Sequence, residues 1–211
     1  MRLLRYGVTL ETLKSEHLEM VRLWRNQDYV RNNMQFKELL TRTNQQEWFN
    51  SMDHEANLYW VISFNDYPIG LIHIKDVDLD NLSGEAGVFI GEPSYLEMPQ
   101  PMLAILFMME LAFYALGLKQ LNAKIKSGNQ RAISFNQKLG YELVLEQPEG
   151  FQYYQASDAS FQSVTKRIRL QSVHMYGGET IIEQVSKLNN LGSALMKGIS
   201  RDDDYFKSKF I

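Results

Sequence analysis

The sequence predicts a mixed α/β fold, with a mostly antiparallel central sheet flanked by helices and a helical extension at the C-terminus. Three observations predict this class. In the first half of the chain, apolar segments of strand length are separated by turn residues. A long apolar helix, a further strand and a short capped helix then follow one another. From about residue 157, apolar residues recur at helical spacing.

Composition limits the function classes. The 211 residues are 45% apolar and 22% charged, which is ordinary for a globular protein. The net charge of −3 gives no electrostatic footprint for nucleic acid, and the lack of cysteine excludes disulfides, thiolate metal sites and a cysteine nucleophile. The four histidines have no ligand spacing, so we expect no metal. Without a signal-peptide core or a run long enough to span a bilayer, we expect a cytoplasmic protein that binds neither nucleic acid nor membrane.

The first third of the chain is expected to hold one strand and two helices. Residues 8–13 read as a strand, and Ser15 caps a helix that ends near Asn26. Residues 30–40 are polar and read as a loop. Thr43, with a glutamine three residues on, forms a capping box for the second helix. The apolar residues of the two helices are Leu18, Val21, Trp24, Trp48, Phe49 and Met52.

Three strands are expected next, at residues 58–64, 69–74 and 85–90. The segments between them carry Asn, Asp and Pro, which are turn residues, so the strands are predicted to be hairpin neighbours. A helix at residues 101–115 follows, with Pro101 at its first position and a glycine just after its end.

The remaining core elements are a strand at residues 121–126, a short helix, and strands at residues 141–145 and 151–155. Asn129 is the expected N-cap of the short helix, and Gly140 its stop. We place the core domain at residues 1–156.

Residues 157–211 form the predicted helical extension. Its apolar residues with helical spacing are Phe161, Val164, Ile168, Ile181, Ile182, Val185 and Leu188. These apolar faces need a partner, and either the core or a second subunit would provide one, so a homodimer through the C-terminal helices is one expectation. The three carboxylates at residues 202–204 read as a solvated turn rather than a metal site.

Residues 129–141 follow the pattern N-x-x-A-x-x-F-x-x-K-x-G-Y. This pattern resembles the second half of the acetyl-CoA core in N-acetyltransferases of the GNAT family. Residues 23–26, 41–49 and 70–76 resemble the subgroup that acts on nucleotide-linked amino sugars, and the ribosomal-protein N-terminal acetyltransferases are similar. The resemblance covers roughly residues 8–154 and implies a GNAT fold with acetyl-CoA as cosubstrate.

The resemblance implies the cosubstrate contacts. In such enzymes the strand that matches residues 85–90 diverges from its neighbour, and its free N–H groups, here at Val88, Phe89 and Ile90, hold the pantetheine arm and polarise the thioester. Asn129 would contact the same arm, besides capping its helix. The following helix start would hold the pyrophosphate on its N–H groups.

The chain departs from the family at this helix start. The family has Gln or Arg followed by Gly-x-Gly, whereas residues 97–104 read E-M-P-Q-P-M-L-A. Two prolines remove two donors, and Glu97 adds a repulsive charge. The residues that we expect to remain for the pyrophosphate are Gln100, Met102, Leu103 and Ala104.

Three residues are candidates for catalysis. Glu85 opens a central strand and would accept the proton of the incoming ammonium, or it is a solvated strand end. His73 is either a second base or a core histidine. Asn136 stands where many relatives carry a tyrosine that protonates the leaving thiolate; an amide can donate a hydrogen bond to sulfur but cannot act as the acid.

The candidate acceptor site is the segment Trp24, Arg25 and Asn26. A resembling arginine would meet nucleotide phosphates through its planar guanidinium, and the alternative is a solvated charge. The aromatic residues nearby would wall a pocket or belong to the core.

The predicted function is therefore N-acetylation of a primary amine, with a nucleotide-linked amino sugar as the leading acceptor. The alternatives are a protein N-terminus as acceptor, or a degenerate GNAT-fold protein that acts as a binding or assembly module. No metal is expected to take part.

Overall fold

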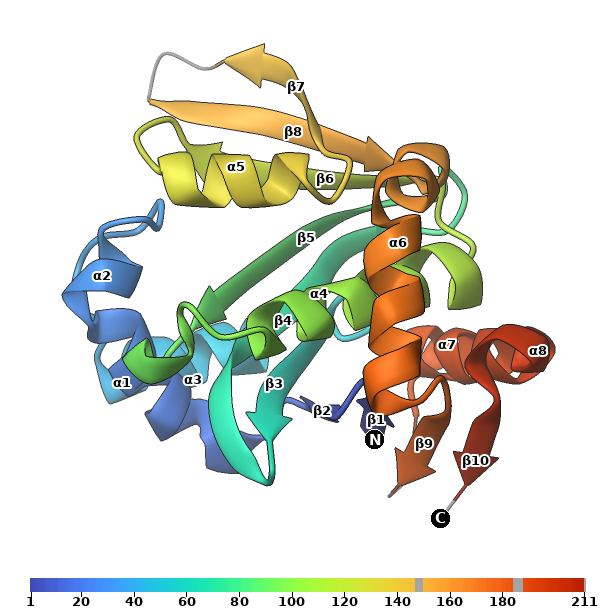
Figure 1. Ribbon diagram of the computed structural model, residues 1–211. Helices are drawn as coiled ribbons and strands as arrows, with labels where there is room; N and C mark the ends of the chain where they lie inside the picture. The colour runs from blue at the N-terminus through green and yellow to red at the C-terminus, as the bar shows by residue number, and fades with distance from the viewer. Residues whose placement is uncertain (147–149, 184–187, 211) are drawn as a thin grey trace.

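The computed structural model describes residues 1–146, 150–183 and 188–210, and it has one ten-stranded sheet flanked by helices (Figure 1). The strand order is β10-β9-β1-β2-β3-β4-β5-β6-β8-β7. The strands are β1 (Arg2–Arg5), β2 (Val8–Thr12), β3 (Leu58–Phe64), β4 (Tyr67–Asp78), β5 (Ser83–Ile90), β6 (Gln120–Lys126), β7 (Glu142–Glu146), β8 (Phe151–Ser157), β9 (Thr180–Glu183) and β10 (Ser208–Phe210). The mixed, mostly antiparallel sheet that the sequence predicts is confirmed.

Helices cover both faces of this sheet. They are α1 (Leu18–Asn26), α2 (Asp28–Arg31), α3 (Arg42–Ser51), α4 (Gln100–Glu110), α5 (Gln130–Gln137), α6 (Asp158–Tyr176), α7 (Asn190–Arg201) and α8 (Asp203–Phe206). A smaller hydrophobic cluster, which includes Leu18 and Leu71, lies between α1 and the sheet. The larger cluster joins the other face of the sheet to α4, α5 and α7. The candidate site lies where these two faces meet at a gap in the sheet.

The central hairpins form as predicted. β3, β4 and β5 pair in antiparallel order, and their registers include Trp60 opposite Ile72 and Ile72 opposite Val88. The short helix is also confirmed, because the side chain of Asn129 accepts a hydrogen bond from the N–H of Ala132 at 3.1 Å. Gly140 then takes a φ of +91°, a conformation that glycine adopts without steric cost.

Several predicted boundaries are wrong near helix starts. The capping box of α3 is formed by Thr41 and Asn44, not by Thr43 and Gln46 as predicted. The side chains of Thr41 and Asn44 each accept a hydrogen bond from the backbone N–H of the other residue. Ser15 begins a 3₁₀ turn before α1 rather than capping it. Part of the predicted loop at residues 30–40 belongs to α2, and Pro101 is the second residue of α4, not the first.

The C-terminal extension contains strands as well as helices. Residues 180–183, which we predicted as helical, form β9, which pairs with β1 in antiparallel order; β10 pairs with β9 in parallel order. Alternating burial along β9, with Thr180 and Ile182 inside, suits β-branched residues in a strand that buries one face. Val185 lies outside the described residues. The division of the chain at residue 156 stays a prediction.

A buried polar network joins this extension to the core. The carboxylate of Glu110 in α4 accepts hydrogen bonds from Arg5 at 3.0 Å, from Tyr6 at 2.7 Å and from Tyr205 at 2.6 Å. Arg5 also donates to Thr180, at 3.1 Å. The Arg5 and Glu110 side chains are 2% and 0% exposed, so each depends on the other for its charge partner.

Candidate functional site

The central feature of the site is a gap between β5 and β6. The two strands run parallel but pair at three register positions only, the last being Glu85 opposite Asn122. From Ala86 to Ile90, β5 pairs with β4 alone, so within the described chain one edge of its backbone has no partner strand. This is the divergence that the resemblance implied. Backbone groups alternate between the two edges of a strand, and Gly91 donates to β4, so the N–H groups of Val88 and Ile90 face the opening; our expectation for Phe89 is wrong, because its backbone faces β4.

The start of α4 borders the gap on the face of the larger cluster. The N–H of Leu103 donates to the carbonyl of Pro99 at 3.1 Å, and Pro101 has no N–H. Gln100 and Met102 therefore supply the free first-turn N–H groups. Our expectation that Leu103 and Ala104 offer donors is wrong, because the first is used inside the helix and the second lies beyond the first four N–H groups.

Gln100 has a second unusual property. Its side chain is 6% exposed, and among the described residues its Oε1 atom has no hydrogen-bond partner. A buried polar atom without a partner is costly in a folded protein. The atom is an acceptor at the helix start where the pyrophosphate was expected, so a ligand group that donates a hydrogen bond would satisfy it, whereas a phosphate oxygen would not.

Arg131 links the start of α5 to the loop before α4, and it was not predicted from the sequence. From the first turn of α5 it reaches the loop before α4, where it forms an ion pair with Glu97 at 2.8 Å and donates to the carbonyl of Leu96. The bridge neutralises the Glu97 charge that we expected to repel a diphosphate. The position of Arg131, two residues after the Asn129 cap that was expected to contact the pantetheine arm, could have indicated it.

Two of the candidate catalytic side chains already have partners. Glu85 is ion-paired with Lys75 of β4 at 3.0 Å, and its side chain is 30% exposed. Asn136 lies in α5, and its Nδ2 donates to the carbonyl of Ala132 at 2.8 Å, which leaves one N–H of the amide for another acceptor. Lys75 was not anticipated from the sequence.

His73 is packed in β4 on the same face of the sheet as Glu85. Its ring stacks on Tyr59 with centroids 4.7 Å apart, and a Cβ atom at Gly87 would lie 2.4 Å from its Cε1. Desolvation by burial lowers the pKa of His73 to about 3. A neutral imidazole with this pKa is a weak base, which favours the core alternative.

The three acceptor-site candidates have different surroundings. Trp24 is 4% exposed, packs over Gly91 and donates from Nε1 to Glu92 at 3.0 Å, so it is a core residue. Asn26 holds the loop before α3 through two hydrogen bonds with the backbone of Leu40, at 2.9 Å and 2.8 Å. Neither side chain is free for a ligand without breaking these contacts.

Arg25 differs from both neighbours. It lies seven residues after Leu18, on the stripe of α1 that turns toward the sheet, and it is half-buried. Within the described chain it makes no hydrogen bond and no ion pair, and desolvation by burial alone lowers its pKa. A partly desolvated guanidinium without an anion is the group that a charged ligand would satisfy.

The described residues bring together one set of possible metal ligands, away from the gap. Ligand atoms of Glu11, Glu16 and His17 lie within 4.8 Å of one another. The Lys14 ammonium lies 2.6 Å from Glu11 and 3.6 Å from Glu16, so a cation of the chain itself stands among the carboxylates.

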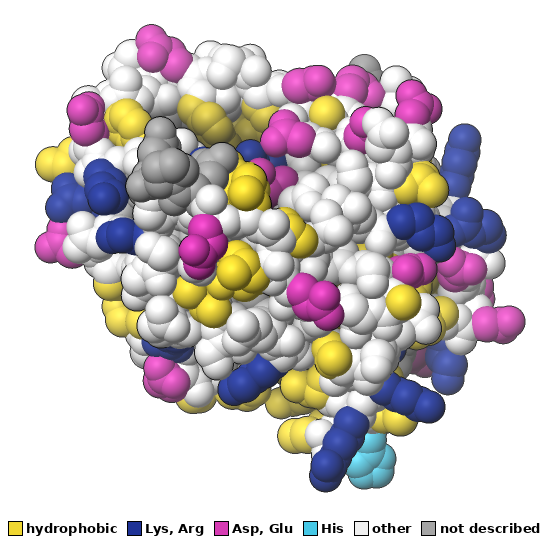
Figure 2. Space-filling view, turned by 90° about the horizontal axis from the view of Figure 1, so that it is seen from above, with side chains coloured by type: hydrophobic (Ala, Val, Ile, Leu, Met, Phe, Trp, Pro, Cys, Tyr) yellow, Lys and Arg dark blue, Asp and Glu magenta, His cyan; other side chains and the backbone are white. Residues whose placement is uncertain are grey.

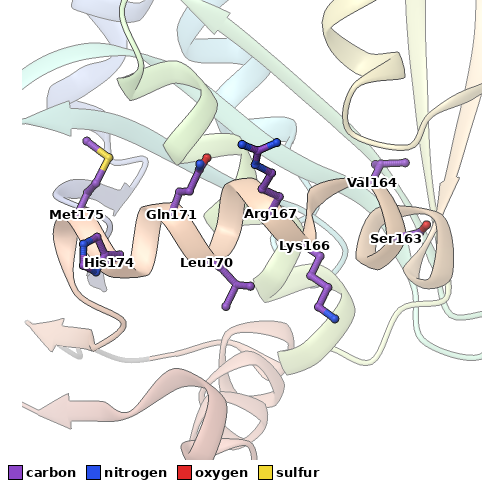
Figure 3. Close-up of a pocket in the computed structure, with 8 residues that line it drawn as sticks. All are labelled: Ser163, Val164, Lys166, Arg167, Leu170, Gln171, His174 and Met175. Atoms are coloured by element: carbon purple, nitrogen blue, oxygen red, sulfur yellow. The ribbon is translucent and has the colours of Figure 1, made fainter.

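The surface is hollowed in more than one place. Figure 2 looks onto the β7 and β8 end and shows a hollow beside the grey residues, with hydrophobic side chains at its bottom and charged side chains of both signs near it. An open groove, of about 820 Å³, follows the outer face of α6, whose lining residues Figure 3 shows. Because a single helix lines this groove, it is a surface for contact more than an enclosed site.

The family is shown by the sequence itself. Residues 8–142 match the model of the acetyltransferase (GNAT) domain, and the chain therefore belongs to the GNAT acetyltransferase family. It is 32% identical over 120 residues to the human alpha/beta-tubulin-N-acetyltransferase 9, covering 56% of this chain and 51% of that protein. The chain thus spans about half the length of this curated relative.

Solved structures share the fold. A nucleotide-linked sugar GNAT, FdhC in its apo form, has a TM-score of 0.67 and 20% identity, over 80% of this chain and 97% of that one. The spermidine N-acetyltransferase of Vibrio cholerae, solved with CoA and spermine, has a TM-score of 0.66 and 15% identity, over 74% and 98%. At these identities the likeness confirms the GNAT fold. No helix in the described ranges is both long and apolar enough to cross a membrane.

Proposed function

We propose that this protein transfers an acetyl group from acetyl-CoA to the primary amine of a nucleotide-linked amino sugar. The observation that carries the proposal is the gap between β5 and β6 beside the N-terminus of α4, where the edge of residues 86–90 that faces away from β4 has no partner strand within the described chain. Family membership and the free helix start support acetyl-CoA as the cosubstrate.

The residues present fit the cosubstrate. The open edge of β5 offers N–H donors for the pantetheine arm, with Asn129 at the facing helix start. The backbone N–H groups of Gln100 and Met102 and the dipole of α4 suit the pyrophosphate. Arg131 can exchange its Glu97 partner for a phosphate oxygen, since both are anionic acceptors.

The chain's own groups would support a direct transfer. When bound, acetyl-CoA supplies the acetyl group as a thioester. The neutral amine would form the new N–C bond as the C–S bond breaks, the N–H groups of Val88 and Ile90 would hold the carbonyl oxygen, and the amine proton would pass to Glu85. Asn136 can donate its remaining N–H to the departing sulfur. We assign the base to Glu85 because the low pKa of His73 makes the imidazole a poorer acceptor.

The choice of acceptor depends on Arg25. A half-buried guanidinium without a counter-charge favours an acceptor that carries an anionic group. A polyamine, the acceptor named for one structural neighbour, would bring like charge to it. A protein N-terminus is the second candidate, because the human relative is named for tubulin N-acetylation.

The first test is calorimetric titration of the full chain with acetyl-CoA. Micromolar binding is expected, and no binding at millimolar acetyl-CoA would leave the degenerate binding module, which the prolines at positions 99 and 101 also favour. A thiol-release assay then compares nucleotide-linked amino sugars, spermidine and N-terminal peptides. Turnover of the peptides alone would overturn the choice of acceptor.

A second copy of the chain is proposed to cover the outer face of α6, in keeping with the expected homodimer. Large apolar side chains are exposed there, including Val164 at 51%, Leu170 at 62% and Met175 at 69%. Sedimentation velocity should show a dimer that Leu170→Glu disrupts and that the control Lys197→Gln does not. The measurement is repeated over a 100-fold range of protein concentration, up to about the millimolar range where weak pairs associate. A monomer at every concentration would contradict the pairing. A cytoplasmic location stays a prediction.

A further inference from the structure

Two lysines of β6 share the face of the sheet that carries Glu85. Lys124 and Lys126 follow Asn122 at every second position, and Asn122 is the register partner of Glu85. Glu85 is in turn opposite Lys75 of β4. On that strand, His73 and Leu71 precede Lys75 at every second position, so they share its face, and Leu71 packs in the smaller cluster against α1. The intervening β6 residues, such as Ala123, face the opposite, larger cluster. Both ammonium groups therefore lie on the α1 side of the gap.

The loop after α2 reaches these lysines across the gap (Figure 1). The Lys124 Nζ donates to Oε1 of Gln35 at 3.2 Å, and the Lys126 Nζ donates to the carbonyl of Asn32 at 3.1 Å. Both acceptors are neutral. Since an ammonium has three donors, each lysine keeps two for another partner.

The positive charge of this pair is not neutralised within the described residues, where neither lysine forms an ion pair. The Lys124 Nζ lies 5.2 Å from the ring centroid of Phe151 and 5.3 Å from that of Tyr153, so aromatic faces hold the ammonium without cancelling its charge. Of the acidic groups that the strands place on this face, Glu85 is paired with Lys75, and Glu142 lies two strands away, opposite Gln155.

We infer that Lys124 and Lys126 bind a diphosphate group of the acceptor while its amine reaches Glu85. This inference rests on the proposed function and names the second half of its acceptor site. Residues two apart on a strand are separated by ~6.6 Å, a spacing at which two ammonium groups flank a diphosphate. Lys124 is separated from Asn122, beside Glu85, by the same ~6.6 Å, which a single sugar ring spans.

This subsite is distinct from the pyrophosphate site of the cosubstrate. The start of α4 packs with the larger cluster, on the opposite face of the sheet from the two lysines. Substitution of the lysines should therefore affect the acceptor alone. The difference between the two faces gives the experiment an internal control.

The test uses the full chain and two double variants. Lys124→Gln with Lys126→Gln removes the pair, and Lys197→Gln with Lys207→Gln removes the same charge from exposed positions in the C-terminal extension. Calorimetry measures the affinity for UDP, inorganic pyrophosphate and acetyl-CoA. The first variant should bind UDP and pyrophosphate at least tenfold more weakly than the wild type, and acetyl-CoA within twofold. The matched control should bind all three like the wild type.

Three outcomes would overturn the inference: equal weakening in both variants, loss of acetyl-CoA affinity alone, or binding of an acidic N-terminal peptide but of neither diphosphate probe. Failure of the proposed function is measured separately. If acetyl-CoA does not bind while UDP binding still depends on the two lysines, the transfer reaction is wrong and the diphosphate subsite stands.

Discussion

Two regions of the molecule differ in how they satisfy buried polar groups. Beside β1, Arg5 and Glu110 are almost fully enclosed, and their hydrogen bonds satisfy one another. Beside the β5–β6 gap, Gln100 has an unpartnered buried oxygen and Arg25 has no counter-ion within the described chain. Burial of polar groups is costly in both regions. In the first region the chain's own side chains provide the partners, so the region is structural. In the second region such partners are missing within the described chain, so a ligand could provide them.

The largest effect is expected where the network is complete. Glu110→Ala leaves the Arg5 guanidinium buried without its anion, and the free energy of unfolding should fall by about 3–5 kcal/mol. Urea denaturation followed by circular dichroism measures it. Glu97→Ala, which removes an exposed partner of Arg131, is the control and should change stability by less than about 1 kcal/mol. A loss at Glu110 as small as that of the control would mean that the network is not what holds the extension to the core.

The reverse pattern is expected at Arg25. Because this guanidinium has no intramolecular partner to lose, Arg25→Gln should leave stability unchanged or slightly raise it. It should raise KM for an anionic acceptor by about 30-fold, which corresponds to about 2 kcal/mol for a charge-assisted hydrogen bond. Steady-state kinetics with the acceptor varied, and calorimetry with acetyl-CoA, separate the two sites. An unchanged KM together with a lower unfolding temperature would make Arg25 structural, like Arg5.

The effect that is smallest at neutral pH, where it vanishes, concerns His73. The pKa of His73 in the folded protein is about 3, below its ordinary value of 6.5, because burial disfavours the imidazolium. The unfolded chain therefore takes up a proton at a higher pH than the folded one. Stability from this group is complete above pH 6.5 and declines as pH falls toward 3, by at most about 1.4 kcal/mol per pH unit.

His73→Gln should remove this contribution. The difference in unfolding free energy between wild type and variant should be constant above pH 7 and shrink between pH 6 and 4, which denaturation at several pH values measures. The same variant is expected to keep the pH profile of kcat, since the base is assigned to Glu85. A change in that profile would return His73 to the catalytic role.

The sequence predicted the elements with strong periodicity. The three central strands were found because alternating apolar residues are separated by turn residues, and α5 because Asn129 and Gly140 mark its ends. Helix starts were less certain, since Thr41 and Thr43 both qualify as caps and only the tertiary contacts choose between them. The strand β9 was missed because four residues next to a helical pattern carry no period of their own.

The candidate site was predicted in outline only. The backbone edge of β5 and the start of α4 were named from the resemblance, and both border the gap. Trp24 was expected to face the acceptor, and it is a core residue instead. Lys75, Lys124, Lys126 and Arg131 were not predicted, because each acquires its role from a neighbour on another element, which a single sequence does not reveal.

What the sequence by itself determined are local preferences and family membership: which segments form strands or helices, where caps and stops fall, and that residues 8–142 follow the GNAT pattern. Only the tertiary structure decided that β5 and β6 pair at three positions and then diverge, and which buried charges have partners. The physical reason is that local preferences depend on neighbours along the chain. The opening of a sheet and the pairing of charges depend on residues far apart in sequence that folding brings within a few ångströms.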